Sequence, residues 1–283
     1  MGGEYQRLGL LKKYNQNLHT HGVLDDGSNT YEDTVKRAIE IGFDGIGFSG
    51  HSYHPYSSAC MSIEGTIEYK KEIARLKKKY ADIIDVFCGI EFDAYSPYEN
   101  LEEYDYVIGS LHYLRFDGQP ITFDGGIKDV KNIINKYFDG NGMLLAKRYY
   151  EELSLLPELV KECDIVGHFD LISKHTELHD LFDTQSREYR SYMLSALDVL
   201  TEKFNIFEIN TGAIARGYRT TAYPDPFVLK ELRTRNCNII ISSDCHNNRF
   251  LDYCFDEMLV LAKECGFDQV LKLTTKGFVA YPI

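Results

Sequence analysis

The 283-residue sequence lacks the features that mark membrane and secreted proteins. It has no hydrophobic signal segment and no apolar run of about 20 residues, the length that crosses a bilayer. Its seven cysteines are an odd number and include no CxxC pair. Neither a disulfide framework nor a redox motif is indicated, so we expect a cytoplasmic protein that does not bind membranes.

Basic residues are also scarce relative to acidic ones. The chain has 31 Lys and Arg against 43 Asp and Glu, which gives a formal net charge of −12. Surfaces that bind nucleic-acid polymers normally carry a basic stripe, so this balance argues against such a partner and favours a small substrate. The sequence contains neither a GxSxG motif nor a P-loop, so neither a serine hydrolase nor an NTPase is indicated.

No Pro-, Ser- or Gly-rich linker and no internal repeat divides the chain. The candidate metal ligands described below extend from position 19 to position 246, so a domain boundary between them would split their site. We therefore predict one domain that covers residues 1–283. The sequence leaves the oligomeric state open.

Short apolar segments alternate with amphipathic segments along the chain, which is typical of parallel strands joined by crossover helices. Strands are predicted up to His21 and at residues 45–51, 83–91, 104–112, 164–170, 205–210, 238–243 and 270–273. Helices are predicted at residues 30–41, 63–80, 128–138, 142–162 with a restart at Pro157, 185–203, 226–235 and 250–265. Residues 112–126 are expected to form an irregular lid or specificity loop, because Asp117 and Gly118 are turn formers.

Histidines stand at the ends of the predicted strands. His19 and His21 are separated by one residue, and in an extended strand such residues point to the same face. Asp244 and His246 have the same spacing after an apolar run. A closed or nearly closed (β/α) barrel collects the C-terminal ends of its strands in one ring, where barrel enzymes carry their catalytic groups. The sequence therefore predicts an α/β barrel with a metal site at this ring.

Further candidate ligands end the other strands or lie beside them. They are His51, Glu91, His112, His168 and, just beyond His21, Asp26, for which Asp25 is the alternative. Together with the two pairs above they make nine ligands, which suffice for three ions if Glu91 bridges two of them. Imidazole and carboxylate ligands without thiolate suit Zn, Fe or Mn, and spacing does not choose among these metals.

The charge of such a cluster predicts its substrate. Three divalent ions would bring six positive charges against three from the carboxylates, and the remaining positive field attracts a compact dianion such as a phosphate monoester. The expected chemistry is metal-assisted hydrolysis, in which the pKa of a bound water falls to about 7 and no side-chain nucleophile is needed. Arg216 follows the sixth predicted strand toward the same face. It is either a bidentate phosphate ligand or a solvated loop arginine.

At this point the sequence resembles the PHP (polymerase and histidinol phosphatase) superfamily. The matching motifs occur in order over nearly the whole chain: His19–His21, Phe48–His51, Gly89–Glu91, Gly109–His112, Gly167–Asp170 and Ser243–His246. Within the superfamily the chain is most similar to the monofunctional histidinol-phosphate phosphatases. That similarity rests on its length, on the long helical insertion between His112 and His168, and on Glu208–Ala213 followed by Arg216.

This resemblance implies a distorted (β/α)7 barrel and hydrolysis of L-histidinol phosphate in histidine biosynthesis. It implies three ions, held by His19, His21, Glu91 and Asp244, by Glu91, His112 and His168, and by Asp26, His51 and His246. Glu91, Asp244 and Arg216 are the expected catalytic residues. The cationic part of the substrate would be bound by an acidic group on the rim, such as Asp170 or Glu208, or by the loop after His112.

The sequence departs from the family pattern at two positions. Asn17 stands where family members often carry Asp, which affects support of the metal ligands rather than ligation. The acidic ligand after the first histidine pair is displaced by one residue, which is why Asp25 competes with Asp26. Two other functions stay open: a PHP phosphoesterase that acts on nucleotides or other small esters, and a non-catalytic metal-binding regulatory module.

Overall fold

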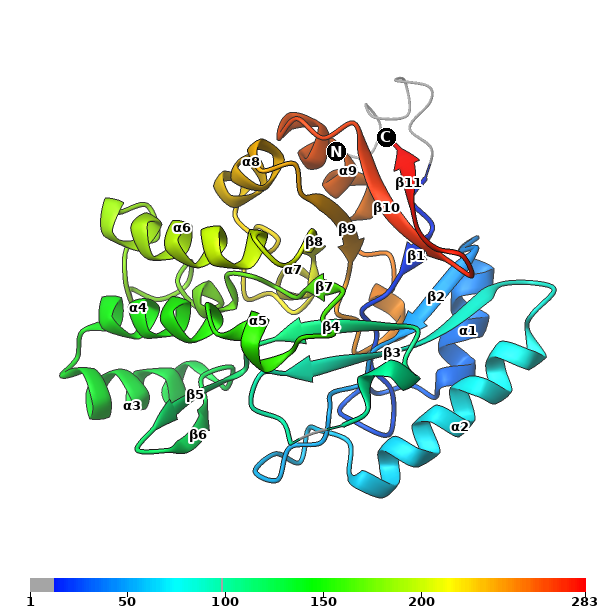
Figure 1. The fold of residues 1–283 in the computed structure, drawn as a ribbon, viewed down its shortest axis with the longest axis horizontal. Coiled ribbons are helices and arrows are strands. Elements are labelled where there is room, and N and C mark those ends of the chain that lie inside the picture. Colours follow the sequence, from blue (N-terminus) through cyan, green and yellow to red (C-terminus); the bar gives the residue numbers. More distant parts are fainter. Residues whose placement is uncertain (1–12, 98) are drawn as a thin grey trace.

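Seven parallel strands form the central sheet in the computed structural model, which describes residues 13–97 and 99–283. Residues 1–12 and 98 of the predicted domain lie outside the described part. Figure 1 shows the strands, which are in spatial order β1 (Gln16–Asn17), β2 (Gly45–Phe48), β3 (Asp85–Asp93), β4 (Tyr106–Ser110), β7 (Ile165–Val166), β8 (Ile206–Asn210) and β9 (Asn238–Ser242). Every neighbouring pair in this order is parallel, which confirms the predicted strand-helix alternation.

The two edges of this sheet meet just beyond β1 and β9. Thr20 and Cys245 form a parallel bridge, in which His21 N donates to Cys245 O at 2.9 Å and Cys245 N donates to His19 O at 3.0 Å. The sheet therefore nearly closes into a barrel, and the predicted α/β barrel is confirmed. Closure brings the first and last strand ends, which carry the two pairs of candidate ligands, to the same point of the ring.

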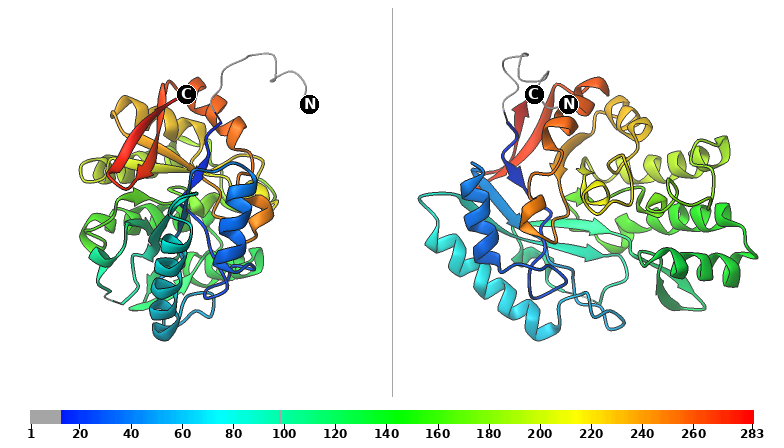
Figure 2. Two further views of the ribbon diagram at one scale, coloured as in Figure 1. Left: turned by 90° about the vertical axis from the view of Figure 1, so that its right-hand side faces the viewer. Right: turned by 180° about the vertical axis from the view of Figure 1, so that it is seen from behind.

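The helices lie around the outside of the sheet (Figure 2). They are α1 (Tyr31–Glu40), α2 (Ile63–Lys79), α3 (Ile127–Phe138), α4 (Gly142–Leu153), α5 (Leu156–Leu159), α6 (Arg187–Thr201), α7 (Gly212–Ala215), α8 (Pro226–Thr234) and α9 (Phe255–Glu264), with 3-10 turns at Leu101–Glu103, Leu171–Ser173 and Asn248–Phe250. The predicted cap at Thr30 is present, since its hydroxyl accepts from Asp33 N at 3.1 Å. Among the described residues, no helix has the length and apolarity needed to cross a membrane.

The barrel interior is packed with side chains from alternate strand positions. They are Leu18, Phe87, Tyr106, Ile108, Ile165 and Ile240, with Leu271 and Leu273 from beyond the barrel strands. The ring of Tyr106 passes so close to Gly89 that a Cβ there would lie 2.2 Å from it, which explains the glycine. Because this interior is filled, the strand ends are the place where the fold offers room for a site.

The prediction of an irregular segment between His112 and Gly126 is wrong. This part of the chain contains an antiparallel hairpin of β5 (Tyr113–Phe116) and β6 (Gln119–Thr122). Asp117 and Gly118 close it with positive φ values of 50° and 78°. Such a two-residue turn matches the twist of a hairpin, so the residues that favoured a loop instead join two strands.

The last predicted strand is β10 (Gln269–Thr274), and it pairs antiparallel with β11 (Gly277–Pro282), which was not predicted. Gln16 of β1 holds this hairpin in place. Its amide donates to Leu273 O at 2.8 Å, and Leu273 N donates back to the Gln16 carbonyl at 2.7 Å. The hairpin therefore ties the last strands of the chain to the first.

Several predicted strands are longer than the observed ones. The strand predicted at residues 164–170 is regular only over Ile165–Val166, although Asp164 N and Gly167 N also donate to carbonyls of β4 residues. Beyond it, His168 N donates to the side chain of Glu208 at 2.6 Å. At His168 a side-chain acceptor thus replaces the backbone acceptor of the neighbouring strand. The regular ladder of backbone hydrogen bonds therefore ends before it reaches His168.

Candidate metal centre

Four side chains from the two closing edges and from β3 bring their ligand atoms together. His19 Nε2 lies 3.2 Å from Glu91 Oε2 and 3.7 Å from Asp244 Oδ1. His21 Nε2 lies 3.6 Å and 3.2 Å from the same two oxygens. A tetrahedral ion with ligand bonds of about 2.1 Å needs ligand atoms about 3.4 Å apart. The four atoms have the spacing that such an ion requires.

These atoms are buried and lack ordinary partners. Among the described residues, His19 Nε2, His21 Nε2 and Glu91 Oε2 have no hydrogen-bond partner. Leaving a buried polar atom unpaired costs about 1–3 kcal/mol, and more for a charged group. Three unpaired atoms that face one another are explained by a cation between them, so the donor set fits a metal ion.

A second group of ligand atoms surrounds the other oxygen of Glu91. Glu91 Oε1 lies 2.8 Å from His168 Nε2 and 3.3 Å from His112 Nε2. The two imidazole nitrogens are 3.2 Å apart. Because Oε2 faces the first group and Oε1 the second, one carboxylate is placed to bridge two ions.

A third group lies at the more exposed edge of the cluster. Asp26 Oδ1 is 3.1 Å from His246 Nε2 and 3.7 Å from His51 Nε2. The ligand atoms of these three residues and of His21 all lie within 4.8 Å of one another. The structure therefore brings all nine predicted ligands to one ring, in three adjoining groups.

Asp25 occupies a different position from Asp26. Its Oδ2 is 2.7 Å from His21 Nδ1 and accepts from His51 N at 3.0 Å, and its Oδ1 accepts from Gly22 N at 2.8 Å. Asp25 therefore faces the back of an imidazole, while Asp26 faces the open nitrogens. This geometry favours Asp26 as the ligand.

Carboxylates stand behind two further imidazoles, a feature that sequence reasoning missed. His19 Nδ1 lies 2.9 Å from Glu208 Oε2, and His112 Nδ1 lies 3.4 Å from Asp93 Oδ2. A carboxylate behind a metal-binding histidine fixes its tautomer and makes it a more basic ligand. The signal for Asp93 was present, because it follows Glu91 by two residues in β3 and so shares its face.

The carboxylates and imidazoles of the cluster shift one another's pKa values. Burial lowers the pKa of His21, but the carboxylates of Asp25 and Asp244 outweigh it and raise this pKa to about 10. Burial raises the pKa of Glu91, but the surrounding imidazoles, His19 foremost, hold it well below its usual range. The Glu91 carboxylate is thus ionised at neutral pH, the form in which it can bind a metal ion.

Arg216 reaches this cluster from the end of α7. Its guanidinium donates to Asp244 Oδ2 at 2.8 Å and to Asp244 O at 2.9 Å, and its side chain is 32% exposed. A Cβ at Gly212 would lie 2.8 Å from the guanidinium, so only glycine permits this approach. Arg216 is therefore not a purely solvated loop residue, the alternative that the sequence left open.

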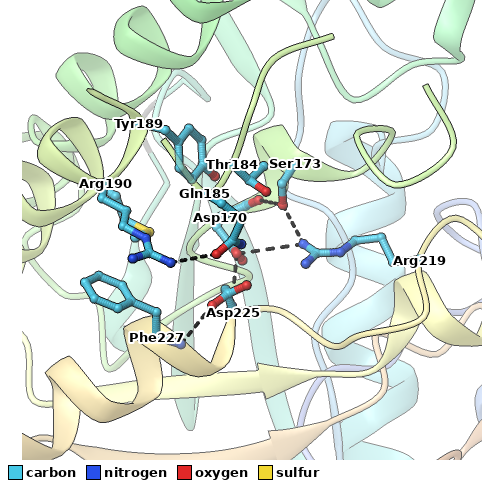
Figure 3. Close-up of a pocket in the computed structure, with 10 residues that line it drawn as sticks. Asp170, Ser173, Thr184, Gln185, Tyr189, Arg190, Arg219, Asp225 and Phe227 are labelled. Carbon is cyan, nitrogen blue, oxygen red and sulfur yellow. Dashed lines mark hydrogen bonds and ion pairs between the residues drawn. The ribbon is translucent and has the colours of Figure 1, made fainter. Parts of the chain in front are cut away.

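The predicted rim carboxylates do not lie on the rim. Figure 3 shows Asp170 facing Arg219 and Asp225. Its Oδ2 accepts from Asp225 N at 3.0 Å and lies 3.7 Å from the Arg219 guanidinium, and the side chain is 2% exposed. The adjoining pocket of about 20 Å³ has room for roughly one water. The prediction of Asp170 as a rim group is wrong, because an arginine from the segment after β8 draws it inward.

Glu208 is also buried, with both oxygens engaged. One faces His19, as described above, and accepts from Ser242 Oγ at 2.5 Å. The other accepts from His168 N at 2.6 Å and from the Asn210 amide at 2.8 Å. Its placement on the rim is therefore wrong, and its contacts are those of a residue that positions two histidines.

A cleft of about 250 Å³ opens beside the cluster. Its lining includes candidate ligands, among them Glu91 and His112. It also includes residues of the β5–β6 hairpin and of the loop that follows it, namely Tyr113, Thr122 and Asp124. The segment after His112 thus lines the approach to the cluster, as the sequence predicted, although as a hairpin.

Asp25→Asn tests the support role of the residue behind His21. The change keeps the size of the side chain but weakens its hold on the imidazole, so metal affinity should fall about 10- to 100-fold. Metal titration followed by elemental analysis measures this loss. Asp33→Asn, an exposed acid-to-amide change on α1, should leave affinity unchanged. Unchanged affinity in Asp25→Asn would show that His21 needs no such support.

Comparison with known proteins gives concordant results. The family model described as PHP domain matches residues 16–212. Histidinol-phosphatase of Bacillus subtilis (strain 168) is 23% identical over 269 residues, which cover 88% of this chain and 99% of that protein. The family match includes the strand ends that carry His19, His21, His51, Glu91, His112 and His168.

Solved structures agree with the fold. A protein from Listeria monocytogenes, provisionally named histidinol phosphatase, matches with a TM-score of 0.77 at 20% identity and covers 86% of this chain and 99% of its own. A histidinol phosphate phosphatase from Lactococcus lactis subsp. lactis, solved with Zn, L-histidinol and phosphate, matches with a TM-score of 0.71 at 19% identity over 94% of this chain and 98% of its own. At these identities the likeness establishes the barrel architecture.

Proposed function

The chain belongs to the PHP domain family, whose model matches more than half of it, and from this premise we propose that it hydrolyses L-histidinol phosphate to L-histidinol and phosphate in histidine biosynthesis. The observation that carries the proposal is the convergence of three groups of ligand atoms on Glu91 and its neighbours. The B. subtilis relative, which carries the name of this activity, is similar over nearly its whole length.

We propose that the cluster holds three divalent transition-metal ions, Zn, Mn or Fe. The first would bind His19, His21, Glu91 and Asp244, the second Glu91, His112 and His168, and the third Asp26, His51 and His246. Ions bound there would polarise phosphoryl oxygens and lower the pKa of a bound water. The L. lactis neighbour was solved with Zn and phosphate, which supports a divalent metal and a phosphorylated ligand.

Residues of this chain would prepare the site for the ester. Glu91 keeps two of the groups at a fixed separation because each of its oxygens faces one of them. Asp25, Asp93 and Glu208 orient three imidazoles from behind. Arg216 adds a guanidinium beside Asp244, where it can stabilise charge on a phosphoryl group.

The size of the cleft favours a small substrate. At about 250 Å³ it lies below the usual range for drug-sized ligands, so it suits a compact ester better than a polymer end. We further propose that residues 1–283 act as one domain and that the protein works in the cytoplasm. All seven cysteines are free, as expected in a reducing compartment.

A substrate panel tests the proposed function. With Mn, Zn or Fe supplied, kcat/KM for L-histidinol phosphate should exceed that for mononucleotides and for an aryl phosphate by at least about tenfold, the discrimination expected from a few specific polar contacts. Phosphate release measures it. A preference for nucleotides would favour another PHP phosphoesterase, and total inertness with metals bound would favour a non-catalytic binding module.

A further inference from the structure

One carboxylate that lines the cleft plays no part in the ligand cluster. Asp124 lies in the loop between the β5–β6 hairpin and α3, and its side chain is 32% exposed. Lys174 donates to Asp124 Oδ1 at 2.8 Å and to Asp124 O at 2.8 Å. Within the described residues, the other carboxylate oxygen accepts no hydrogen bond. Asp124 is thus held in position while one oxygen stays available to a ligand.

The other carboxylates of the cleft are occupied. Asp26 and Glu91 face the open nitrogens of the histidine cluster. Asp93 accepts from His112 N at 2.7 Å and from Tyr95 N at 2.8 Å, and it lies behind the His112 imidazole. Of the carboxylates that line the cleft, Asp124 is therefore the one that neither belongs to the ligand cluster nor supports a ligand. It is the one that a cationic group could bind.

Lys174, the partner of Asp124, does not prevent Asp124 from binding a cationic group in the cleft. Lys174 is not among the residues that line the cleft. Its ammonium lies 4.7 Å from the centre of the Tyr218 ring. Burial raises the pKa of Asp124, but Lys174 and the imidazoles of His112 and His168 lower it below its usual range. The carboxylate is therefore ionised at neutral pH, and the two imidazoles that influence it belong to the second ligand group.

We propose that Asp124 is the specificity-determining residue that binds the ammonium group of an aminoalkyl phosphate ester while the phosphate lies at the cluster. The inference rests on the proposed function and deepens it. The cleft is lined both by candidate cation-binding ligands and by a fixed anion, which complements a substrate with an anionic and a cationic end. With an uncharged ester the second oxygen of Asp124 would gain no donor from the substrate, which gives discrimination in favour of the amine.

Asp124→Asn separates this role from that of a loop anchor. The amide oxygen can still accept from Lys174, so the loop stays tied, but the negative charge is lost. We expect kcat/KM for L-histidinol phosphate to fall about 10- to 100-fold, the range for a lost hydrogen bond between charged groups. For the same ester with hydrogen in place of the amino group, the change should stay within about twofold. Metal content should equal that of the wild type.

The matched control is Asp117→Asn, which removes the same charge from the exposed turn of the adjacent hairpin. It should leave both substrates unaffected. An equal loss for both esters in Asp124→Asn would make Asp124 only a loop anchor, and no loss for either would remove it from the binding site. If the wild type turned over neither ester, the proposed function itself would fail, and this assignment with it.

Discussion

Glu91→Gln should abolish turnover and empty much of the metal cluster. The substitution keeps the volume of the side chain but removes its charge, and it replaces one of two oxygens that face different ligand groups. The new NH2 group would point at imidazole nitrogens or at Ser110 Oγ, which now donates to Glu91 Oε1 at 2.8 Å. We expect kcat to fall by about 10³-fold or more, because the positioning and polarising effects of the two proposed ions that Glu91 would bridge would be lost together.

Elemental analysis and phosphate release measure the two effects of Glu91→Gln. Glu152→Gln is the matched control, since Glu152 is also buried, at 4% exposure, but lies on α4 and bonds Tyr95 and Arg148. It should retain its full metal content. If Glu91→Gln binds three ions and turns over normally, Glu91 does not bridge, and the trinuclear arrangement is wrong.

Arg216→Ala should lower kcat/KM for every phosphate monoester. The loss of transition-state stabilisation should be about 2–4 kcal/mol, the usual cost of removing an electrostatic stabiliser of the transition state. The ranking of substrates should change little, because the guanidinium acts on the phosphoryl group that all of them share. Steady-state kinetics with L-histidinol phosphate and an aryl phosphate measure both expectations. A change within about twofold for both esters would show that Arg216 does not bind phosphate.

The contacts of Arg216 with Asp244 allow a second explanation, in which it acts by holding a metal ligand. Metal content distinguishes the two. An Arg216→Ala enzyme that keeps its ions but loses activity supports a direct effect on the phosphoryl group, and one that loses the first ion supports a positioning role. Arg249→Ala removes an exposed arginine just beyond His246 and should leave both measurements unchanged, because the guanidinium of Arg249 donates to Asn247 and not to a candidate ligand.

The fold was predictable wherever periodicity and strand-end chemistry agreed. The central strands and the crossover helices follow from apolar patterns that only a parallel sheet with outer helices can bury. The β5–β6 hairpin was missed because its strands are four residues long and contain Pro120, so they lack a clear alternating pattern. Among the described residues, β11 pairs with β10 alone and buries little, so it also lacked a strong signal.

The nine candidate ligands were predictable because most stand at strand ends, which barrel closure brings together. The contacts of the residues around these ligands were not predictable. Asp124 and Lys174 meet across 50 residues of sequence, and Asp170 turns away from the cluster because Arg219 arrives from a different loop. Such pairings depend on how loops pack, for which a single sequence carries no periodic signal. Their metal and substrate roles remain predictions.

The bridge between Thr20 and Cys245 has a consequence for the order in which the protein matures during synthesis. His19 and His21 leave the ribosome well before Asp244, the fourth member of their group, which follows more than two hundred residues later. Domains generally fold as units once their chain has emerged. A growing chain that has not yet reached Cys245 therefore cannot form the bridge that closes the barrel. Metal loading at the proposed first group would therefore come only after synthesis has passed Asp244.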